Sequence, residues 1–433
     1  DMDHLGLDLG TTTISAAVLD ADGRLLCTRT VPGGAAVAGQ PWERKQDARG
    51  IEHAALSLLD GLLQEFPDIG CVGLTGQMHG IVYVDAAGQL LSPLYTWQDE
   101  TGAQPGPDGK STAARLTART GYPLASGYGL VTLACHQAAG TIPNGAAAVC
   151  TIADYLAMRL SGRSAPCLTP SMAASLGLFD GTGFDREAVR RAGLPERLLP
   201  EVSEEAELGG GRLRVFAALG DNQASFLGAG QGRLDAPLIN IGTGSQFSFF
   251  TKEHRTVPGL ETRPFPGGWL LTGAPLCGGR SFALLERFFR QTAELVTGTP
   301  CPSAYPAMLR ALEAPMPDDV PQFRTTFAGT RQDPAERAVL SGLDEENFAP
   351  VPLLHALLRG MADELSACYR AALKAGCAPA GRLLGSGNGL RRNPALQRAV
   401  ERSFGLPLTL AAVPEEAACG AALFTRMQHE AAL

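Results

Sequence analysis

The chain has 433 residues, a net charge of −8 and a hydrophobic content of 45%. This length predicts two or three domains, each with enough apolar material for a core. No Lys/Arg run is longer than a pair such as Arg391-Arg392, so composition argues against nucleic acid or an anionic membrane as the main partner, because both require a basic face.

The ten cysteines are scattered, with no C-x-x-C pair and no zinc-type spacing, which favours reduced thiols. No apolar run approaches the roughly 18 residues of a membrane span. No signal peptide opens the sequence. We therefore expect a cytoplasmic protein with no membrane partner.

Strand-like and helix-like segments alternate along the chain, which is typical of the α/β class. Apolar runs predict strands at residues 5–9, 14–20, 24–30, 71–74 and 81–85. The apolar spacing of residues 51–66 predicts a helix between the third and fourth of these strands. Residues 101–211 are rich in Gly, Pro and Ala and give no clear elements. From residue 350 onward, helix and strand patterns alternate again.

An internal echo links the two halves of the sequence. "LDLGTTTISAAVL" resembles "INIGTGSQFSFF", with Asp8 aligned on Asn240, and both predict a strand, a Gly-Thr turn and a second strand. The echo predicts two similarly built domains, 1–232 and 233–433, divided after the small-residue stretch "NQASFLGAGQG". A chance similarity between short motifs is the alternative.

The two Gly-Thr turns are candidate phosphate cradles, since exposed backbone N–H groups and threonine hydroxyls can bind phosphate oxygens. The first turn comprises Gly10, Thr11, Thr12 and Thr13, and the second comprises Gly242, Thr243, Gly244 and Ser245. The first turn leads into a strand and lacks G-K-[ST], so it fits neither a P-loop nor a dinucleotide-binding pattern. Asp8, at the end of the first strand, is a candidate for holding Mg²⁺ through its water shell. The alternative is a pair of ordinary hairpins.

Asp221 in "LGDNQASFLGAG" follows a predicted strand and begins a helix of small residues. Aspartate is among the best N-cap residues, so a structural role is one interpretation. The other is a base that deprotonates a hydroxyl attacking a γ-phosphate, as acidic residues do in kinases.

Two loops carry side chains suited to a polyhydroxylated ligand. "GLTGQMHG" presents Gln77, Met78 and His79, and "TWQDE" presents Trp97 and Asp99. Together they offer hydrogen bonds and an apolar wall. A structural histidine and a buried tryptophan are the alternatives.

The segment "LLGSGNGLRRN" predicts a strand followed by a glycine loop. Open α/β sheets bind ligands at the carboxyl ends of strands, so a nucleoside can pack here. Asn393 and Pro394 then predict the start of a helix, as N-cap and first-turn residues.

Seven motifs in order along almost the whole chain make this sequence resemble the FGGY carbohydrate kinases, members of the actin/Hsp70/hexokinase superfamily. They are "LDLGTTT", "GLTGQMHG", "TWQDE", "LGDNQASFLGAG", "INIGTGSQ", "LLGSGNGLRRN" and "PEEAACGAAL". The resemblance implies two actin-like (ribonuclease H-like) domains, with mixed sheets flanked by helices, facing across a central cleft.

The resemblance also implies roles for individual residues. Asp221 is the expected catalytic base, Asp8 the carboxylate linked to Mg²⁺, and the two Gly-Thr turns the phosphate loops for ATP. The expected sugar contacts are Gln77, Met78, His79, Trp97, Asp99, Asp221 and Asn222. The expected adenosine contacts are Gly385, Gly387 and Asn388.

The implied activity is ATP-dependent phosphorylation of a ketose, by a monomer or a homodimer. Sedoheptulose is the first candidate substrate, and xylulose or another pentulose is the alternative. Ser15 departs from the family, because many members carry Lys or Arg there. A sugar-sensing pseudokinase is therefore an alternative of a different class, although the presence of Asp8 and Asp221 argues against it.

Overall fold

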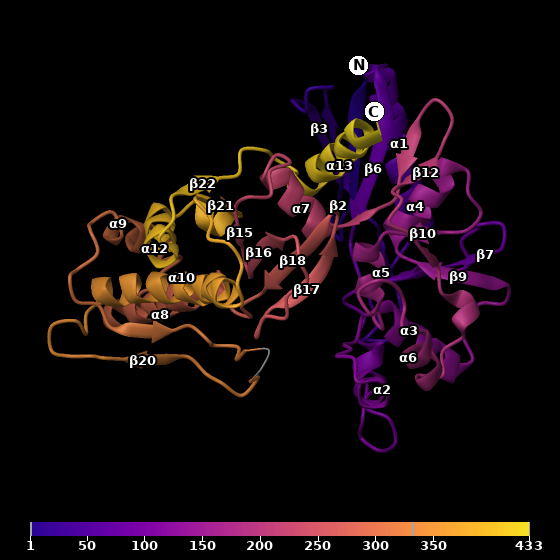
Figure 1. The fold of residues 1–433 in the computed structure, drawn as a ribbon. Helices are drawn as coiled ribbons and strands as arrows, with labels where there is room; N and C mark the ends of the chain where they lie inside the picture. The colour runs from indigo at the N-terminus through magenta and orange to yellow at the C-terminus, as the bar shows by residue number, and fades with distance from the viewer. Residues whose placement is uncertain (1, 331–332, 433) are drawn as a thin grey trace. The chain divides into compact units, whose positions relative to one another are not determined.

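The computed structural model describes residues 2–330 and 333–432, and the chain divides into two units (Figure 1). Unit 1 comprises Asp1–Gly232, Pro264–Pro266 and Val413–Leu433. Unit 2 comprises Arg233–Arg263 and Gly267–Ala412.

Unit 1 contains one large sheet, several small sheets and mostly short helices. Its strands are β1 (Asp3–Leu9), β2 (Thr13–Leu19), β3 (Leu25–Pro32), β4 (Ala36–Val37), β5 (Lys45–Gln46), β6 (Ile69–Gly76), β7 (Val82–Asp85), β8 (Leu94–Tyr95), β9 (Ala146–Cys150), β10 (Cys167–Leu168), β11 (Glu201–Val202), β12 (Glu207–Gly209), β13 (Arg214–Phe216) and β14 (Leu219–Gly220). Its helices are α1 (Ala48–Glu65), α2 (Thr112–Thr120), α3 (Gly129–Ala139), α4 (Ile152–Ser161), α5 (Pro170–Leu176), α6 (Arg186–Arg191), α7 (Asp221–Ala229) and α13 (Glu416–Ala432), with 3₁₀ turns at Thr101–Ala103 and Glu196–Leu198.

Unit 2 is built from one larger sheet, one hairpin and a set of longer helices. Its strands are β15 (Leu238–Ile241), β16 (Ser245–Thr251), β17 (Glu261–Phe265), whose last two residues are assigned to unit 1, β18 (Gly268–Gly273), β19 (Gln322–Arg324), β20 (Val339–Ser341), β21 (Leu383–Ser386) and β22 (Leu408–Leu410). Its helices are α8 (Arg280–Thr297), α9 (Tyr305–Ala311), α10 (Pro350–Lys374), α11 (Asn388–Arg391) and α12 (Pro394–Phe404).

The main sheet of unit 1 is mixed. Among the described residues its strand order is β12-β13-β6-β1-β2-β3, with β14 also paired to β6. β1, β2 and β3 form an antiparallel meander, whereas β6 runs parallel to β1, β13 and β14. Because β1, β6 and β14 are parallel, their carboxyl ends lie at one edge of the sheet, and this edge positions the site.

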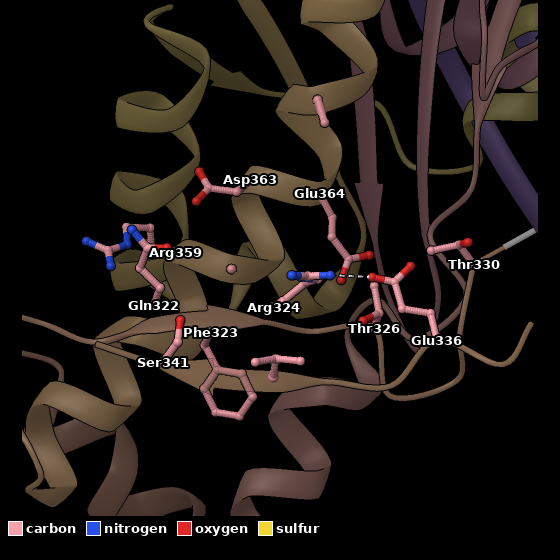
Figure 2. Close-up of a pocket in the computed structure, with 13 residues that line it drawn as sticks. Gln322, Phe323, Arg324, Thr326, Thr330, Glu336, Ser341, Arg359, Asp363 and Glu364 are labelled. Atoms are coloured by element: carbon pink, nitrogen blue, oxygen red, sulfur yellow. Dashed lines mark hydrogen bonds and ion pairs between the residues drawn. The ribbon is translucent and has the colours of Figure 1, made fainter. Parts of the chain in front are cut away.

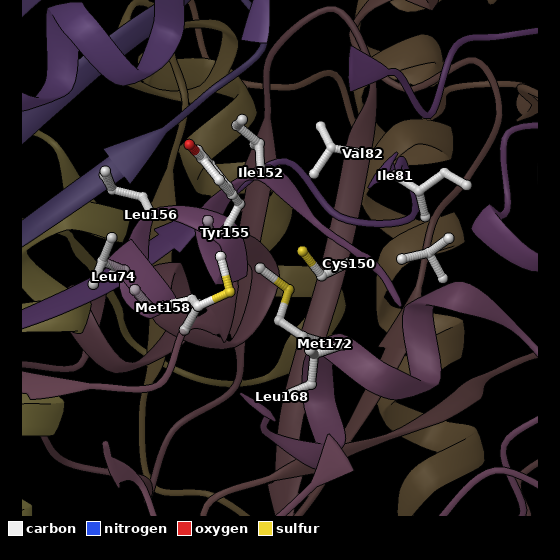
Figure 3. Close-up of a cluster of buried hydrophobic side chains, with 14 of the residues drawn as sticks. Leu74, Ile81, Val82, Cys150, Ile152, Tyr155, Leu156, Met158, Leu168 and Met172 are labelled. Carbon is white, nitrogen blue, oxygen red and sulfur yellow. The ribbon is translucent and has the colours of Figure 1, made fainter. Parts of the chain in front are cut away.

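Alternate residues of a strand point to opposite sides of a sheet. The two faces of this sheet are covered by different elements. Leu5, Leu7 and Leu9 of β1 belong to the larger core, together with buried residues of α1 and α4. Figure 3 shows part of this core, where side chains of β6, β7, β9, α4 and α5 gather. On the other face, a Cβ at Gly6 would collide with the carbonyl oxygen of Ala418 in α13.

Helix α13 packs on unit 1 through glycines. A Cβ at Gly420 would collide with the carbonyl oxygen of Ala224 in α7, and one at Gly228 of α7 would collide with that of Glu416. The sequence assigned residues 413–433 to a second domain of residues 233–433. That division stays a prediction. In the structure this last helix packs within unit 1, because its glycines and alanines fit against β1 and α7, which lie far away along the chain.

The main sheet of unit 2 repeats the arrangement of unit 1. Its order is β17-β18-β16-β15-β21-β22 within the described residues. β15 is antiparallel to β16, β16 is antiparallel to β18, and β21 lies parallel to β15. Asp8 and Asn240 are each the penultimate residue of the equivalent strands β1 and β15, as the internal echo predicted.

The predicted elements of the first hundred residues correspond to β1, β2, β3, α1, β6 and β7. Helix α1 begins three residues earlier than predicted because Asp47 caps it, accepting a hydrogen bond from Gly50 N at 3.1 Å. Asn393 caps α12 as predicted, and its side chain accepts from Leu396 N. All ten cysteines are free thiols. None of the helices described here is long and apolar enough to cross a membrane.

Candidate active site

Three parallel strand ends bring the predicted acidic residues of unit 1 together. Asp8 of β1 is in register with Thr75 of β6, and Thr75 is in register with Leu219 of β14, two residues before Asp221. Neighbours in register point to the same face of a sheet. Asp8 and Thr75 therefore face the side that α7 and α13 cover, opposite to the leucines of β1.

Several buried oxygen atoms at this edge lack a hydrogen-bond partner within the described residues. They are Asp8 Oδ1, Thr75 Oγ1, Gln77 Oε1 and Gln223 Oε1. Leaving a buried polar group unsatisfied costs about 1–3 kcal/mol, and native proteins retain few such groups. The cluster therefore marks a place where a ligand, an ion or water completes the hydrogen bonding.

The surroundings of Asp8 are acidic. Burial, followed by the nearby carboxylates of Asp221 and Glu415, raises the pKa of Asp8 from 3.8 to about 7. Thr30 Oγ1 donates to Glu415 Oε1 at 3.1 Å, and Ser15 Oγ lies 3.2 Å from Thr30 Oγ1. Ser15 is itself the cross-strand partner of Asp8. Bound cations suit such a site because they offset this concentration of negative charge.

Asp221 opens helix α7 but does not cap it. The N-cap is Gly220, with extended backbone at φ −60° and ψ 146°, and Asp221 is the first helical residue. The N-cap interpretation of Asp221 is therefore wrong. A carboxylate in the first turn still interacts favourably with the helix dipole. Asn222, the next residue, is buried.

The first Gly-Thr turn is held by side chains from two other segments. Gln46 Nε2 donates to the Thr11 carbonyl at 2.8 Å, and Trp97 Nε1 donates to Thr11 Oγ1 at 2.9 Å. A Cβ at Gly10 would lie 2.8 Å from the Thr13 carbonyl oxygen, so the tight turn requires glycine. The indole of Trp97 is 46% exposed and is not the buried tryptophan of the alternative interpretation.

Gln77, Met78 and His79 form the loop after β6, as predicted. Gln77 and Met78 are buried. His79 has a left-handed φ of 73°, and its Nδ1 lies 2.7 Å from the Ser175 carbonyl oxygen. Because that carbonyl only accepts, Nδ1 carries a proton in this contact. The ring stacks on Tyr128 at a centroid distance of 4.8 Å.

Asp99 is buried, and its carboxylate holds backbone groups. Oδ2 accepts from Arg44 N at 2.9 Å and Oδ1 accepts from Thr101 N at 3.0 Å. These bonds fix the loop that presents Trp97. The expected contact of Asp99 with a sugar stays a prediction.

In unit 2 the second Gly-Thr turn lies against the start of α8. Gly242 N donates to the Gly244 carbonyl at 2.9 Å, and Arg280 N, at the first residue of α8, donates to the Thr243 carbonyl at 2.9 Å. A Cβ at Gly279 would collide with the Gly242 carbonyl oxygen. The positive end of an 18-residue helix therefore lies beside the turn, an arrangement that favours phosphate.

The glycines after β21 reach the same turn. A Cβ at Gly387, where φ is 91°, would lie 2.5 Å from the Ile241 carbonyl oxygen, and one at Gly389 would lie 2.8 Å from it. Asn388 is exposed at the start of α11. Gly385, in contrast, is buried inside β21 against leucine side chains. Unit 2 thus joins the predicted phosphate turn to two of the three predicted adenosine residues.

A separate cavity of about 480 Å³ lies in unit 2 between the β19–β20 hairpin and α10 (Figure 2). Its charged side chains are engaged within the protein: Arg324 pairs with Glu336 at 2.8 Å, and Thr325 Oγ1 donates to Glu364. The predicted site residues are absent from the described lining of this cavity.

Sequence reasoning missed three residues at the unit 1 site: Gln46, Thr75 and Glu415. Glu415 lies within the motif "PEEAACGAAL", but the motif alone gave it no role. Gln46 bonds to Thr11 and Gln77, and Thr75 lies in register with Asp8. These neighbours come from other segments of the chain, so no local pattern identifies Gln46 or Thr75.

Comparison with known proteins covers nearly the whole chain. The N-terminal domain of the FGGY family of carbohydrate kinases matches residues 4–231, and the C-terminal domain matches residues 238–429. Sedoheptulokinase of Mus musculus is 29% identical, covering 97% of this chain and 96% of that protein, and sedoheptulokinase of Homo sapiens is 28% identical, covering 98% and 97%.

The fold is also that of solved structures. Ligand-bound xylulose kinase from Lactobacillus acidophilus superposes with a TM-score of 0.79 at 19% identity, covering 100% of this chain and 90% of that one. Both domain models match in order, and the two mixed sheets flanked by helices agree with an actin-like fold. The chain therefore belongs to the FGGY family of carbohydrate kinases and is an ATP-dependent sugar kinase.

Proposed function

We propose that this sugar kinase phosphorylates a ketose, and that its preferred substrate is sedoheptulose, converted to sedoheptulose 7-phosphate. Two relatives named sedoheptulokinase, 28–29% identical over nearly the whole chain, support the substrate. The observation that carries the catalytic part is the cluster of Asp8, the start of α7 and unsatisfied buried oxygens at one sheet edge.

Asp221 is the proposed general base. Its carboxylate accepts the proton of the terminal sugar hydroxyl while the hydroxyl oxygen forms a bond to the γ-phosphorus of ATP. The bond from that phosphorus to the β–γ bridging oxygen breaks, and ADP leaves with the electron pair. The position of Asp221 in the first turn of α7, beside the end of β14, supports this role.

The proposed phosphate binders are the two Gly-Thr turns, residues 10–13 and 242–245, through backbone N–H groups and hydroxyls. The start of α8 supports the second turn electrostatically. Gly387 and Asn388 are proposed to contact adenosine, and Gly385 to shape the strand beneath them.

The carboxylate of Asp8 is suited to hold Mg²⁺. Its Oδ1 is buried without a partner among the described residues, and its carboxyl is surrounded by further acids. The described residues contain no group of three His, Cys, Asp or Glu side chains able to hold a metal ion. This agrees with Mg²⁺, which keeps most of its waters and binds through one or two carboxylates. When bound, the ion offsets negative charge on the phosphoryl oxygens.

The proposed sugar contacts are Gln77, Met78, His79, Trp97, Asp99 and Asn222. Gln77 Oε1 is an acceptor suited to a sugar hydroxyl. The exposed indole of Trp97 is suited to packing on a sugar face.

The test is ADP release with ATP and Mg²⁺ across sedoheptulose, D-xylulose, D-ribulose, L-ribulose and glycerol. We expect the highest kcat/KM on sedoheptulose. A preference for D-xylulose would replace the substrate but keep the chemistry, and xylulose kinases 22–26% identical to this chain make it the second candidate. Sugar binding without turnover on any of the five would contradict the proposed function.

A further inference from the structure

Both ends of the Gln46 side-chain amide are engaged. Its Nε2 donates to the Thr11 carbonyl at 2.8 Å, and its Oε1 accepts from Gln77 Nε2 at 3.0 Å. An amide nitrogen only donates and an amide oxygen only accepts, so the two bonds together fix the orientation of this side chain. Gln46 thus connects the first Gly-Thr turn directly to the loop after β6.

Hydrogen bonds also hold the backbone and the side chain of Gln77, and only its Oε1 is left without one among the described residues. Its backbone N donates to the Leu9 carbonyl at 2.9 Å, and its Nε2 is used by Gln46. Its Oε1 is buried and has no partner within the described residues, although the side chain is only 3% exposed. The atom that still lacks a hydrogen bond is therefore an acceptor, and a donor such as a sugar hydroxyl complements it.

We propose that Gln46 is a positioning residue that couples sugar binding at Gln77 to the phosphate turn at Thr11. The inference rests on the proposed function. A sugar hydroxyl that donates to Gln77 Oε1 extends a continuous hydrogen-bonded chain through both amides to the Thr11 carbonyl. Hydrogen bonds in such chains polarise and strengthen one another. Sugar binding thereby stabilises the turn in one conformation and favours nucleotide binding.

Two substitutions separate this coupling from simple support of the fold. Gln46→Met keeps the length of the side chain but removes both hydrogen bonds. Gln46→Glu still accepts from Gln77 but cannot donate to Thr11. Gln64→Met is the matched control, because Gln64 is an exposed residue of the same type on α1.

The experiment is calorimetric titration of the full chain with the ketose that the wild type phosphorylates fastest, and with MgADP in the presence and absence of that ketose. In the wild type and in Gln64→Met, the ketose should lower the Kd of ADP by about fivefold or more. In Gln46→Met the ratio of the ADP Kd without ketose to the ADP Kd with ketose should fall to about one. The Kd of the ketose itself should rise about tenfold. Gln46→Glu should lose the ratio but retain more ketose affinity than Gln46→Met.

A wild-type ratio in both Gln46 variants, or a ratio of one in the wild type, would overturn the proposal. If Gln46→Met does not fold, the comparison of Gln46→Glu with wild type decides the same point. Failure of the proposed function has a different signature, because the wild type would then phosphorylate no ketose, and the coupling would fall with it.

Discussion

At the scale of single residues, two buried aspartates of unit 1 serve the fold in opposite ways. Asp99 uses both carboxylate oxygens to accept backbone N–H groups, from Arg44 and Thr101. Hydrogen bonds to a charged acceptor contribute about 1.5–3 kcal/mol each. Asp99 therefore joins the strand that carries Gln46 to the loop that carries Trp97.

We predict that Asp99→Ala lowers the free energy of unfolding by about 2–4 kcal/mol, because two backbone donors lose their acceptor. Asp99→Asn should cost about half as much, since its one oxygen still accepts. Urea denaturation measures both, with the exposed neighbour Glu100→Ala as control. Unchanged stability in Asp99→Ala, together with weaker sugar binding, would show that the carboxylate serves the ligand and not the loop.

Asp154 lies in the first turn of α4 and is fully buried. Thr151 Oγ1 donates to its Oδ2 at 2.6 Å, while Oδ1 has no partner among the described residues. Burial raises the pKa of Asp154 from 3.8 to about 7, and the Thr151 hydrogen bonds only partly oppose this. The folded protein therefore binds this proton more tightly than the unfolded chain.

Protonation of Asp154 makes stability depend on pH. The stabilising contribution of this proton is complete below the unfolded pKa, near pH 4, and is lost as the pH rises through the folded pKa of about 7, so the free energy of unfolding falls across that interval. Asp154→Asn carries no charge at this position. The free energy of unfolding of this variant should therefore rise relative to that of wild type by about 3 kcal/mol between pH 5 and pH 8. Urea denaturation at several pH values, with the exposed Asp60→Asn as control, measures this difference. Parallel curves for wild type and Asp154→Asn would contradict it.

At the scale of elements, the contact between α7 and α13 depends on the absence of side chains. Gly228 and Gly420 each face a carbonyl oxygen of the other helix, at a distance that leaves no room for a Cβ. Asp221 begins α7, and Glu415 immediately precedes α13. The close crossing of these helices thus sets where two carboxylates lie relative to Asp8.

We predict that Gly420→Ala destabilises the protein by about 1–3 kcal/mol, although alanine favours helix, because the helices must separate. The control is Gly61→Ala in α1, where a Cβ has no neighbour within 4 Å. That change should stabilise by up to about 1 kcal/mol. Thermal unfolding distinguishes them, and a Gly420→Ala variant as stable as wild type would refute the close-crossing account.

Local patterns were sufficient for elements whose determinants are local. Apolar runs predicted β1 and β2, and 3.6-residue spacing predicted α1. Residues 101–211 escaped prediction because their helices are short and several end at left-handed glycines, such as Gly121 and Gly162. The return of α13 to unit 1 depends on glycines that match surfaces far along the chain, which no local pattern contains.

At the scale of the whole molecule, two sheets with the same strand relations explain why the sequence echoes itself at Asp8 and Asn240. Ordered motifs identified the acids and turns, because their residue types suit phosphate and metal chemistry. They could not identify Gln46, Thr75 or Glu415, whose roles arise only when strands and helix ends meet. Asp221, found by motif, is the residue on which the proposed chemistry depends.

The most direct test of this account is turnover of Asp221→Asn with ATP, Mg²⁺ and the preferred ketose, measured together with ketose binding. Asparagine keeps the shape of the side chain but cannot take a proton, so we predict that kcat falls by about 10²–10⁴-fold while the ketose Kd changes little. Asp60→Asn should match wild type. If Asp221→Asn retains kcat within about tenfold of wild type, Asp221 is not the base and the proposed mechanism is wrong.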